Sequence, residues 1–185
     1  HPQGLGNSSG LVGQRYMAHR ATMMEAFDPR RPHDTSFQKT VALNDFYRPS
    51  ERHHFPLGNI QSQGRVHPAQ GKSVMPFLPT RAIEAWTRRG VEWLAMSEDL
   101  PSPENRVTLT SSGRIQLHYS IGSSPVHGLL VREARRLLRR AGYPVVIAHE
   151  FRNGNTTHQC GTAVFGDDPR TSVLDPLCRS HDVEN

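Results

Sequence analysis

The chain has 185 residues, of which 35% are hydrophobic and 21% charged, and this low apolar share indicates a loop-rich domain or one whose core a partner completes. No apolar run approaches the roughly 20 residues that cross a bilayer, so we expect no membrane span. The net charge of +5 is concentrated between residues 132 and 140, which favours a solvent-exposed basic face over general affinity for nucleic acid.

The first half of the chain predicts strands separated by turns. Residues 1–15 are rich in Gly and Ser and form a loop in this interpretation. Runs of β-favouring, alternating residues then predict strands over 16–27, 36–46, 57–66 and 91–96. A short helix is expected over 79–90, because Pro79 suits a helix start and Gly90 a helix end.

The second half contains the clearest periodic segments. Alternating apolar residues predict a hairpin of strands 106–110 and 114–120, with Gly113 in its loop. A helix is predicted over 125–141, with Ser124 as its cap, Pro125 at its first position and Gly142 at its end. Its apolar residues fall on one face and five arginines on the other. A short buried strand over 145–148 should follow.

These elements predict an α+β fold, a largely antiparallel sheet of about six strands with helices packed on one face. Little periodicity remains after Glu150. The predicted organisation is therefore a loop over 1–15, a domain over 16–150 and a C-terminal segment with little periodicity over 151–185.

Several kinds of site are excluded or disfavoured by spacing. The eleven histidines form no HExxH pattern, so no metal site is expected, and no GxSxG motif is present. Cys160 and Cys178 match no zinc spacing, and reduced thiols favour a cytoplasmic protein, with a periplasmic location open for a longer one. The glycines of 4–10 lack the flanking strand and helix that a dinucleotide pyrophosphate requires.

The informative stretch begins with THQCGTA at 157–163, followed by FGDDP at 165–169 and SVLDP at 172–176. It resembles the C-terminal signature of glucose-methanol-choline (GMC) oxidoreductases, in which His-x-x-Gly-Thr precedes Ser-Val-(Val/Leu)-Asp. Residues 11–19 and 96–107 resemble two further family segments in the expected order. The family has Pro and a small residue where Gln159 and Cys160 stand here, which leaves the substrate subclass open.

The resemblance implies part of an FAD-dependent oxidoreductase that acts on the CH–OH group of a sugar, polyol or choline-like alcohol. It also implies that residues 1–15 are a loop from the boundary of the FAD domain, 16–150 the substrate-binding domain and 151–185 the start of a truncated C-terminal catalytic segment. His158 would then be the base that takes the hydroxyl proton, a role that imidazole suits at physiological pH. Gly161 and Thr162 would lie near the flavin. Candidate substrate contacts are Asn155, Gln159 and His19. His181 is interpreted as a surface-loop residue.

The same resemblance implies partners outside these residues. FAD would be held mainly by the FAD-binding part of the same protein, and the second catalytic residue would lie beyond Asn185. The residues here would then neither retain FAD nor turn over alone. Two alternatives remain open, a basic module that binds nucleic acid and a ligand-binding domain without catalysis. The first lacks any recognisable nucleic-acid motif.

Overall fold

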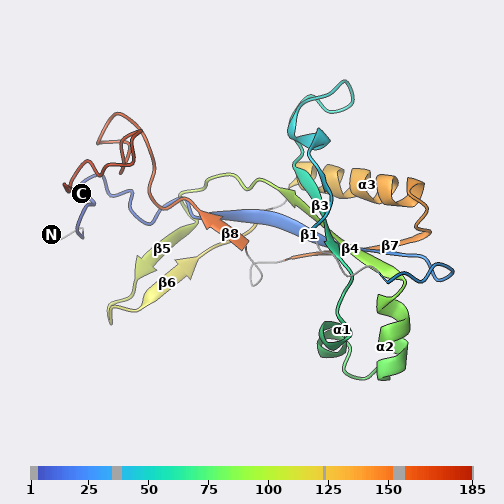
Figure 1. The fold of residues 1–185 in the computed structure, drawn as a ribbon. Coiled ribbons are helices and arrows are strands. Elements are labelled where there is room, and N and C mark those ends of the chain that lie inside the picture. The colour runs from blue at the N-terminus through green and yellow to red at the C-terminus, as the bar shows by residue number, and fades with distance from the viewer. Residues whose placement is uncertain (1–3, 35–38, 123, 152–156, 185) are drawn as a thin grey trace. The chain divides into compact units, whose positions relative to one another are not determined.

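The computed structural model describes residues 4–34, 39–122, 124–151 and 157–184 (Figure 1). Its strands are β1 (Met17–Phe27), β2 (Ala42–Leu43), β3 (Asn59–Gly64), β4 (Gly90–Ser97), β5 (Arg106–Leu109), β6 (Ile115–His118), β7 (Val145–Glu150) and β8 (Thr157–Cys160). Its helices are α1 (Pro68–Val74), α2 (Thr80–Thr87) and α3 (Pro125–Arg140), and Asp45–Tyr47 forms a 3-10 helix.

Six of the strands form one sheet in the order β2-β3-β4-β1-β7, with β8 paired to the start of β1. The pairings in this sheet are all antiparallel, and β5 and β6 form a separate antiparallel hairpin. The α+β fold with a largely antiparallel sheet of about six strands, predicted from the sequence, is confirmed.

The described residues pack into two units. The sheet unit comprises the described parts of 20–98 and 123–152, and it contains β2, β3, β4, β7 and the three helices. The hairpin unit comprises the described parts of 1–19, 99–122 and 153–185, and it contains β5, β6 and β8. Strand β1 begins in the hairpin unit and continues into the sheet unit.

The core of the sheet unit lies between α3 and one face of the sheet. Because side chains alternate along a strand, Met24 and Ala26 of β1 share this face with Val146 of β7 and Ala95 of β4. Helix α3 contributes Leu130, Ala134 and Leu138, three residues spaced to fall on one helical face. Full burial of each large aliphatic side chain here stabilises the fold by roughly 1.5–3 kcal/mol.

Helix α3 begins and ends as the sequence predicts. The Ser124 side chain accepts a hydrogen bond from the His127 N–H, Pro125 occupies the first turn, and Gly142 follows the helix with a φ of 99°. Its arginines lie on the side away from the core: Arg132, Arg135, Arg136, Arg139 and Arg140. Of these, Arg136 pairs with the buried Glu133 at 2.8 Å.

Four local predictions differ from the structure. The strand expected over 36–46 is reduced to Ala42–Leu43, followed by the 3-10 turn, and residues 36–38 lie outside the described part. The sequence missed α1, whose start is capped by His67 and Gln70. The strand expected to be buried over 145–148 is β7, which lies at the edge of the sheet with only Val146 buried. The sequence also missed β8, because a four-residue strand of mixed polarity has no periodicity to detect.

A buried carboxyl group lies on the sheet face opposite to α3. Glu25 is 9% exposed, and both of its carboxyl oxygens are buried without a hydrogen-bond partner in the described structure. Glu25 lies across from Glu92 on β4. Its side chain lies over Gly90, so a Cβ at position 90 would meet the Glu25 Oε1. Burial, and to a smaller extent the negative charge of Glu92, together raise the pKa of Glu25 to about 8.

No helix among the described residues is long and apolar enough to span a membrane.

We expect Glu25→Gln to stabilise the protein at pH 7, because the ordinary pKa of 4.5 is raised to about 8 by folding. The folded state therefore holds a proton that the unfolded state has released, and stability falls as pH rises from 4.5 toward 8. The amide removes this cost, so the free energy of unfolding should rise by about 1–3 kcal/mol at pH 7 and by little at pH 4. Denaturant titrations across this range measure it.

The matched control is Glu98→Gln, which changes the exposed glutamate that directly follows β4. It should leave the pH dependence of stability unchanged. A Glu25→Gln protein with the same pH dependence as the unsubstituted one would contradict the assignment.

Candidate functional site

Three segments far apart in the sequence meet in the hairpin unit. The Gly13 N–H donates to the Thr162 carbonyl at 2.8 Å, and the Gly13 carbonyl accepts from the Val107 N–H at 2.7 Å. Residues 13–16 thus lie between the loop that follows β8 and the start of β5. This position requires glycine at 13, because its φ is 85° and a Cβ there would meet the Val107 carbonyl oxygen.

This backbone frame holds His158 on β8 beside His19 on β1. Met17 pairs with Cys160 and His19 with Thr157, and the register shifts between these two pairs. His158 lies at this irregularity with a φ of 53°, a left-handed conformation that costs a residue with a side chain about 1–2 kcal/mol. Bulges of this kind re-aim a side chain, and strained backbone is concentrated at functional sites.

The two imidazole rings meet edge to face, with their centroids 5.2 Å apart and their planes at 89°. His19 is half-buried and His158 is exposed, so the contact restrains the His158 ring while leaving part of it open to solvent. The sequence had named both residues from separate motifs, and the fold brings them together across 139 positions of the chain. The pair can exchange a proton with a bound molecule.

Gly161 and Thr162, the predicted flavin contacts, have backbones that pack against and hydrogen-bond to residues 14 and 15. Gly161 has a φ of 89°, and a Cβ on it would lie 2.0 Å from the Arg15 carbonyl oxygen. The Thr162 N–H donates to the Gln14 carbonyl at 3.1 Å. Their backbone is therefore held by close contacts and hydrogen bonds within the fold, and their contact with a flavin stays a prediction.

The remaining predicted contacts are less defined by the structure. Gln159 is exposed on β8 between His158 and Cys160. Asn155 lies outside the described residues. Both therefore stay predictions.

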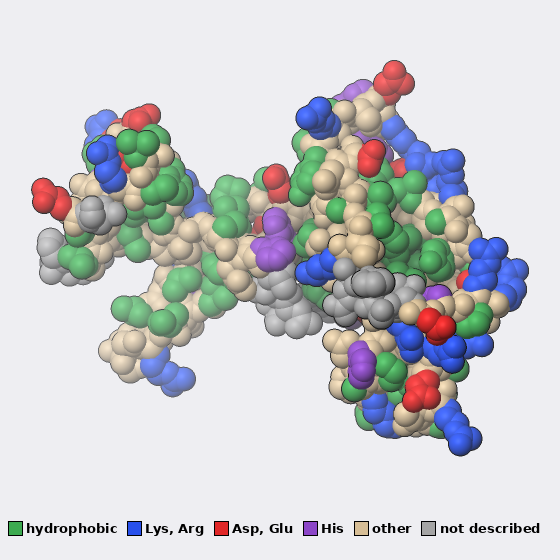
Figure 2. Space-filling model, viewed as in Figure 1, with side chains coloured by type: hydrophobic (Ala, Val, Ile, Leu, Met, Phe, Trp, Pro, Cys, Tyr) green, Lys and Arg blue, Asp and Glu red, His purple; other side chains and the backbone are tan. Residues whose placement is uncertain are grey.

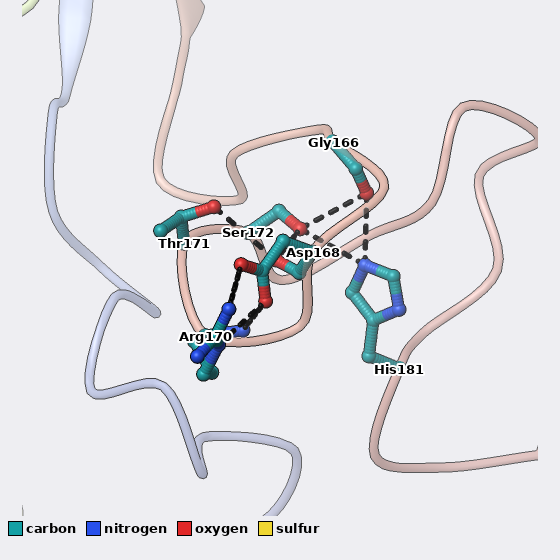
Figure 3. Close-up of polar contacts among 6 residues, drawn as sticks. All are labelled: Gly166, Asp168, Arg170, Thr171, Ser172 and His181. Atoms are coloured by element: carbon teal, nitrogen blue, oxygen red, sulfur yellow. Dashed lines mark hydrogen bonds and ion pairs between the residues drawn. The ribbon is translucent and has the colours of Figure 1, made fainter.

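The C-terminal segment of the hairpin unit is ordered by a polar network around Ser172 (Figure 3). The buried Ser172 hydroxyl lies 2.6 Å from the Asp168 carbonyl oxygen and donates to it. Nε2 of His181 lies 2.9 Å from both the Ser172 Oγ and the Gly166 carbonyl oxygen. Since a carbonyl can only accept, we assign the proton to Nε2 of His181.

His181 is therefore not a plain surface-loop residue, which corrects the sequence interpretation. The sequence lacks a signal for it, because its partners in the network are Ser172 and a main-chain carbonyl. Asp168 and Asp175 each accept hydrogen bonds from backbone N–H groups within their own turns. Asp168 accepts from the Arg170 N–H and pairs with its guanidinium, which lowers the pKa of this carboxyl.

A cavity of about 510 Å³ in the sheet unit contains a second polar cluster, which the sequence missed. Buried Arg20 pairs there with Glu150 at 3.0 Å. The ring of His127, 2% exposed, lies between the hydroxyls of Thr22 and Ser97 at 2.7 and 2.8 Å. Burial lowers the pKa of His127, so the neutral ring is favoured. A signal existed, because His127 falls on the apolar face of α3 with Leu130 and Ala134.

Among the described residues, no three His, Cys, Asp or Glu side chains gather in a group that could hold a metal ion. Cys160 and Cys178 are both free and exposed.

Comparison with known proteins adds two findings. Residues 101–185 match the sequence model of a family described as GMC oxidoreductase. The whole chain aligns with the fructose dehydrogenase large subunit of Gluconobacter japonicus, with 27% identity over 205 residues. The chain spans 37% of the length of that relative.

We expect Gly161→Ala to destabilise the protein by about 2–4 kcal/mol, because the added Cβ meets the Arg15 carbonyl oxygen and the left-handed φ is unfavourable for alanine. Gly113→Ala is the matched control. It has a similar φ of 77° with nothing within 4 Å of the added Cβ, and it should cost only about 1–2 kcal/mol. Denaturant unfolding of both variants measures the difference, and equal losses would contradict the close approach.

Proposed function

Since residues 101–185 of this chain belong to the GMC oxidoreductase family, we propose that the chain is the substrate-side portion of an FAD-dependent enzyme that oxidises a CH–OH group. The resemblance found in the sequence motifs is thereby confirmed at the level of the family. The proposal goes further in naming the cofactor, the reaction and the base.

The observation that carries the proposal is the exposed imidazole of His158, held at a bulge and restrained by His19. A base that abstracts a hydroxyl proton must lie within hydrogen-bond reach of it and keep its orientation. In our proposal His158 accepts the proton from the alcohol and His19 keeps the ring in place. Gln159 and Asn155 hold other hydroxyls of the substrate.

FAD, when bound, supplies the acceptor for the hydride that leaves the alcohol carbon. The two imidazoles fit this chemistry, because proton removal strengthens hydride donation and needs no metal ligand set. The described residues of the hairpin unit offer the Thr162 hydroxyl toward such a group. The glycine-rich residues 4–10 contain no strand or helix, so we propose that another part of the protein holds the cofactor.

A sugar or polyol is the substrate class that we favour within this proposal. The aligned relative is named a fructose dehydrogenase, and it matches over the full length of this chain. The polar side chains of His19, in contact with the base, and of Gln159, next to it in sequence, suit a polyhydroxylated molecule, whose additional hydroxyls need hydrogen-bond partners. A choline-like alcohol would instead need an aromatic or anionic site for its cation.

His158→Ala in the intact protein should lower kcat by about 10²–10⁴-fold, because the proton acceptor is lost while the flavin remains bound. Steady-state kinetics with sugar and polyol substrates, together with flavin absorbance, test this. His54→Ala, which changes an exposed histidine of the sheet unit, is the control and should leave kcat unchanged. A kcat unaffected by His158→Ala would refute the role.

Residues 1–185 prepared alone should not retain stoichiometric flavin and should not oxidise alcohols. The reason is that the described residues contain no dinucleotide-binding fold for the adenosine and pyrophosphate groups. The absorbance of the flavin bands, at about 350–500 nm, measured after desalting, shows how much flavin the protein retains. A stoichiometric yellow preparation would overturn the proposed division of the site.

A further inference from the structure

The β5–β6 hairpin has one apolar and one polar face. Val107 lies across from Leu117 and Leu109 across from Ile115, so these four aliphatic side chains share a face. The other face carries Thr108 and His118, whose side chains lie 3.1 Å apart, together with Gln116. Such division between the faces is typical of a sheet that packs on one side only.

The apolar face is open in the described structure. Ile115 is 78% exposed, Leu109 70% and Leu117 47%, and hydrophobic side chains are visible along the hairpin in Figure 2. A two-stranded hairpin is marginally stable by itself. Among the described residues β6 pairs only with β5, so no further strand extends the hairpin beyond β6.

The hairpin belongs to the same backbone frame as the histidine pair. β5 is joined to residues 13 and 14 by the Val107 N–H and by a bridge between Arg106 and Gln14. The same two residues hold Thr162, four positions after His158. Whatever covers the hairpin therefore also steadies the segment that presents His158.

We propose that the apolar face of Val107, Leu109, Ile115 and Leu117 is the docking surface for the flavin-binding portion of the same polypeptide. This rests on the proposed function only in assuming that such a portion exists. The proposal adds which residues hold it, and it assigns to the hairpin the task of keeping the His158 segment in register with the remainder of the enzyme.

The size of the face argues for this occupant. Stable interfaces between separate proteins bury about 1,200–2,000 Å² in total, far more than four aliphatic side chains on one hairpin can provide. A second copy or a separate subunit would also have to offset the loss of translational and rotational freedom. A linked portion of the same chain acts at high effective concentration, so a small apolar patch is enough. The aligned relative extends well beyond this chain, which spans 37% of it.

Cysteine labelling of the full-length protein tests the docking directly. Ile115→Cys places a thiol on the apolar face, and Gln116→Cys places one on the polar face of the same strand. With a maleimide reagent and peptide mass spectrometry, the Ile115→Cys site should react at least about tenfold more slowly than the Gln116→Cys site, because it reacts only after local opening. The exposed Cys160 and Cys178 serve as internal references.

Leu109→Cys and Thr108→Cys repeat the comparison on β5, so the test survives a variant that fails to fold. Equal labelling of the two faces in the folded protein would overturn the proposal. Protection that disappears on dilution, together with a change in molar mass by light scattering, would overturn it in favour of a second copy. Protection that requires a copurifying subunit would likewise overturn it.

The outcome is separable from the proposed function. A protein that holds flavin and protects the Ile115→Cys site but does not oxidise alcohols supports the docking and refutes the proposed reaction. An active flavoprotein in which both faces are labelled equally supports the proposed function and overturns the docking.

Discussion

The constraint on which most of this structure depends is the alternation of side chains along β1. One set of alternate residues, including Met24 and Ala26, faces α3 and forms the core. The other set contains Glu25, and the strand pairs with β4, β7 and β8. A shift of one residue would exchange the two sets and place Glu25 on the α3 face, so the core fixes the side on which this carboxyl lies.

The histidine pair shows how little of a site depends on side-chain packing. His158 is placed by backbone hydrogen bonds around Gly13 and by a positive φ in a bulge, whereas the ring contact with His19 only restrains it. A backbone frame of this kind leaves the imidazole accessible. A packed core residue, such as His127 between Thr22 and Ser97, is rigid but buried, and its lowered pKa reflects that burial.

Two features show that the described residues alone do not satisfy every group. The carboxyl of Glu25 is buried without a hydrogen bond, and the hairpin exposes three large aliphatic residues on one face. Each carries a free-energy cost, one from desolvation and one from apolar surface in water. The hairpin lies in the same frame as His158, which connects this cost to the proposed site.

The sequence by itself determined the elements whose periodicity is strong and local. The helix with Ser124 at its start, the hairpin around Gly113 and the long strand of β1 were all predicted, because capping, turn chemistry and alternation act within a few residues. It also contains the motifs, including His158, that resemble the GMC oxidoreductase family, whose model matches residues 101–185. Tertiary structure alone decided that His19 meets His158, that Gly161 lies against the Arg15 carbonyl, and that β8 pairs with β1. These depend on hydrogen bonds between backbone segments about 140 positions apart, and backbone groups are the same in every residue, so no side-chain pattern encodes them.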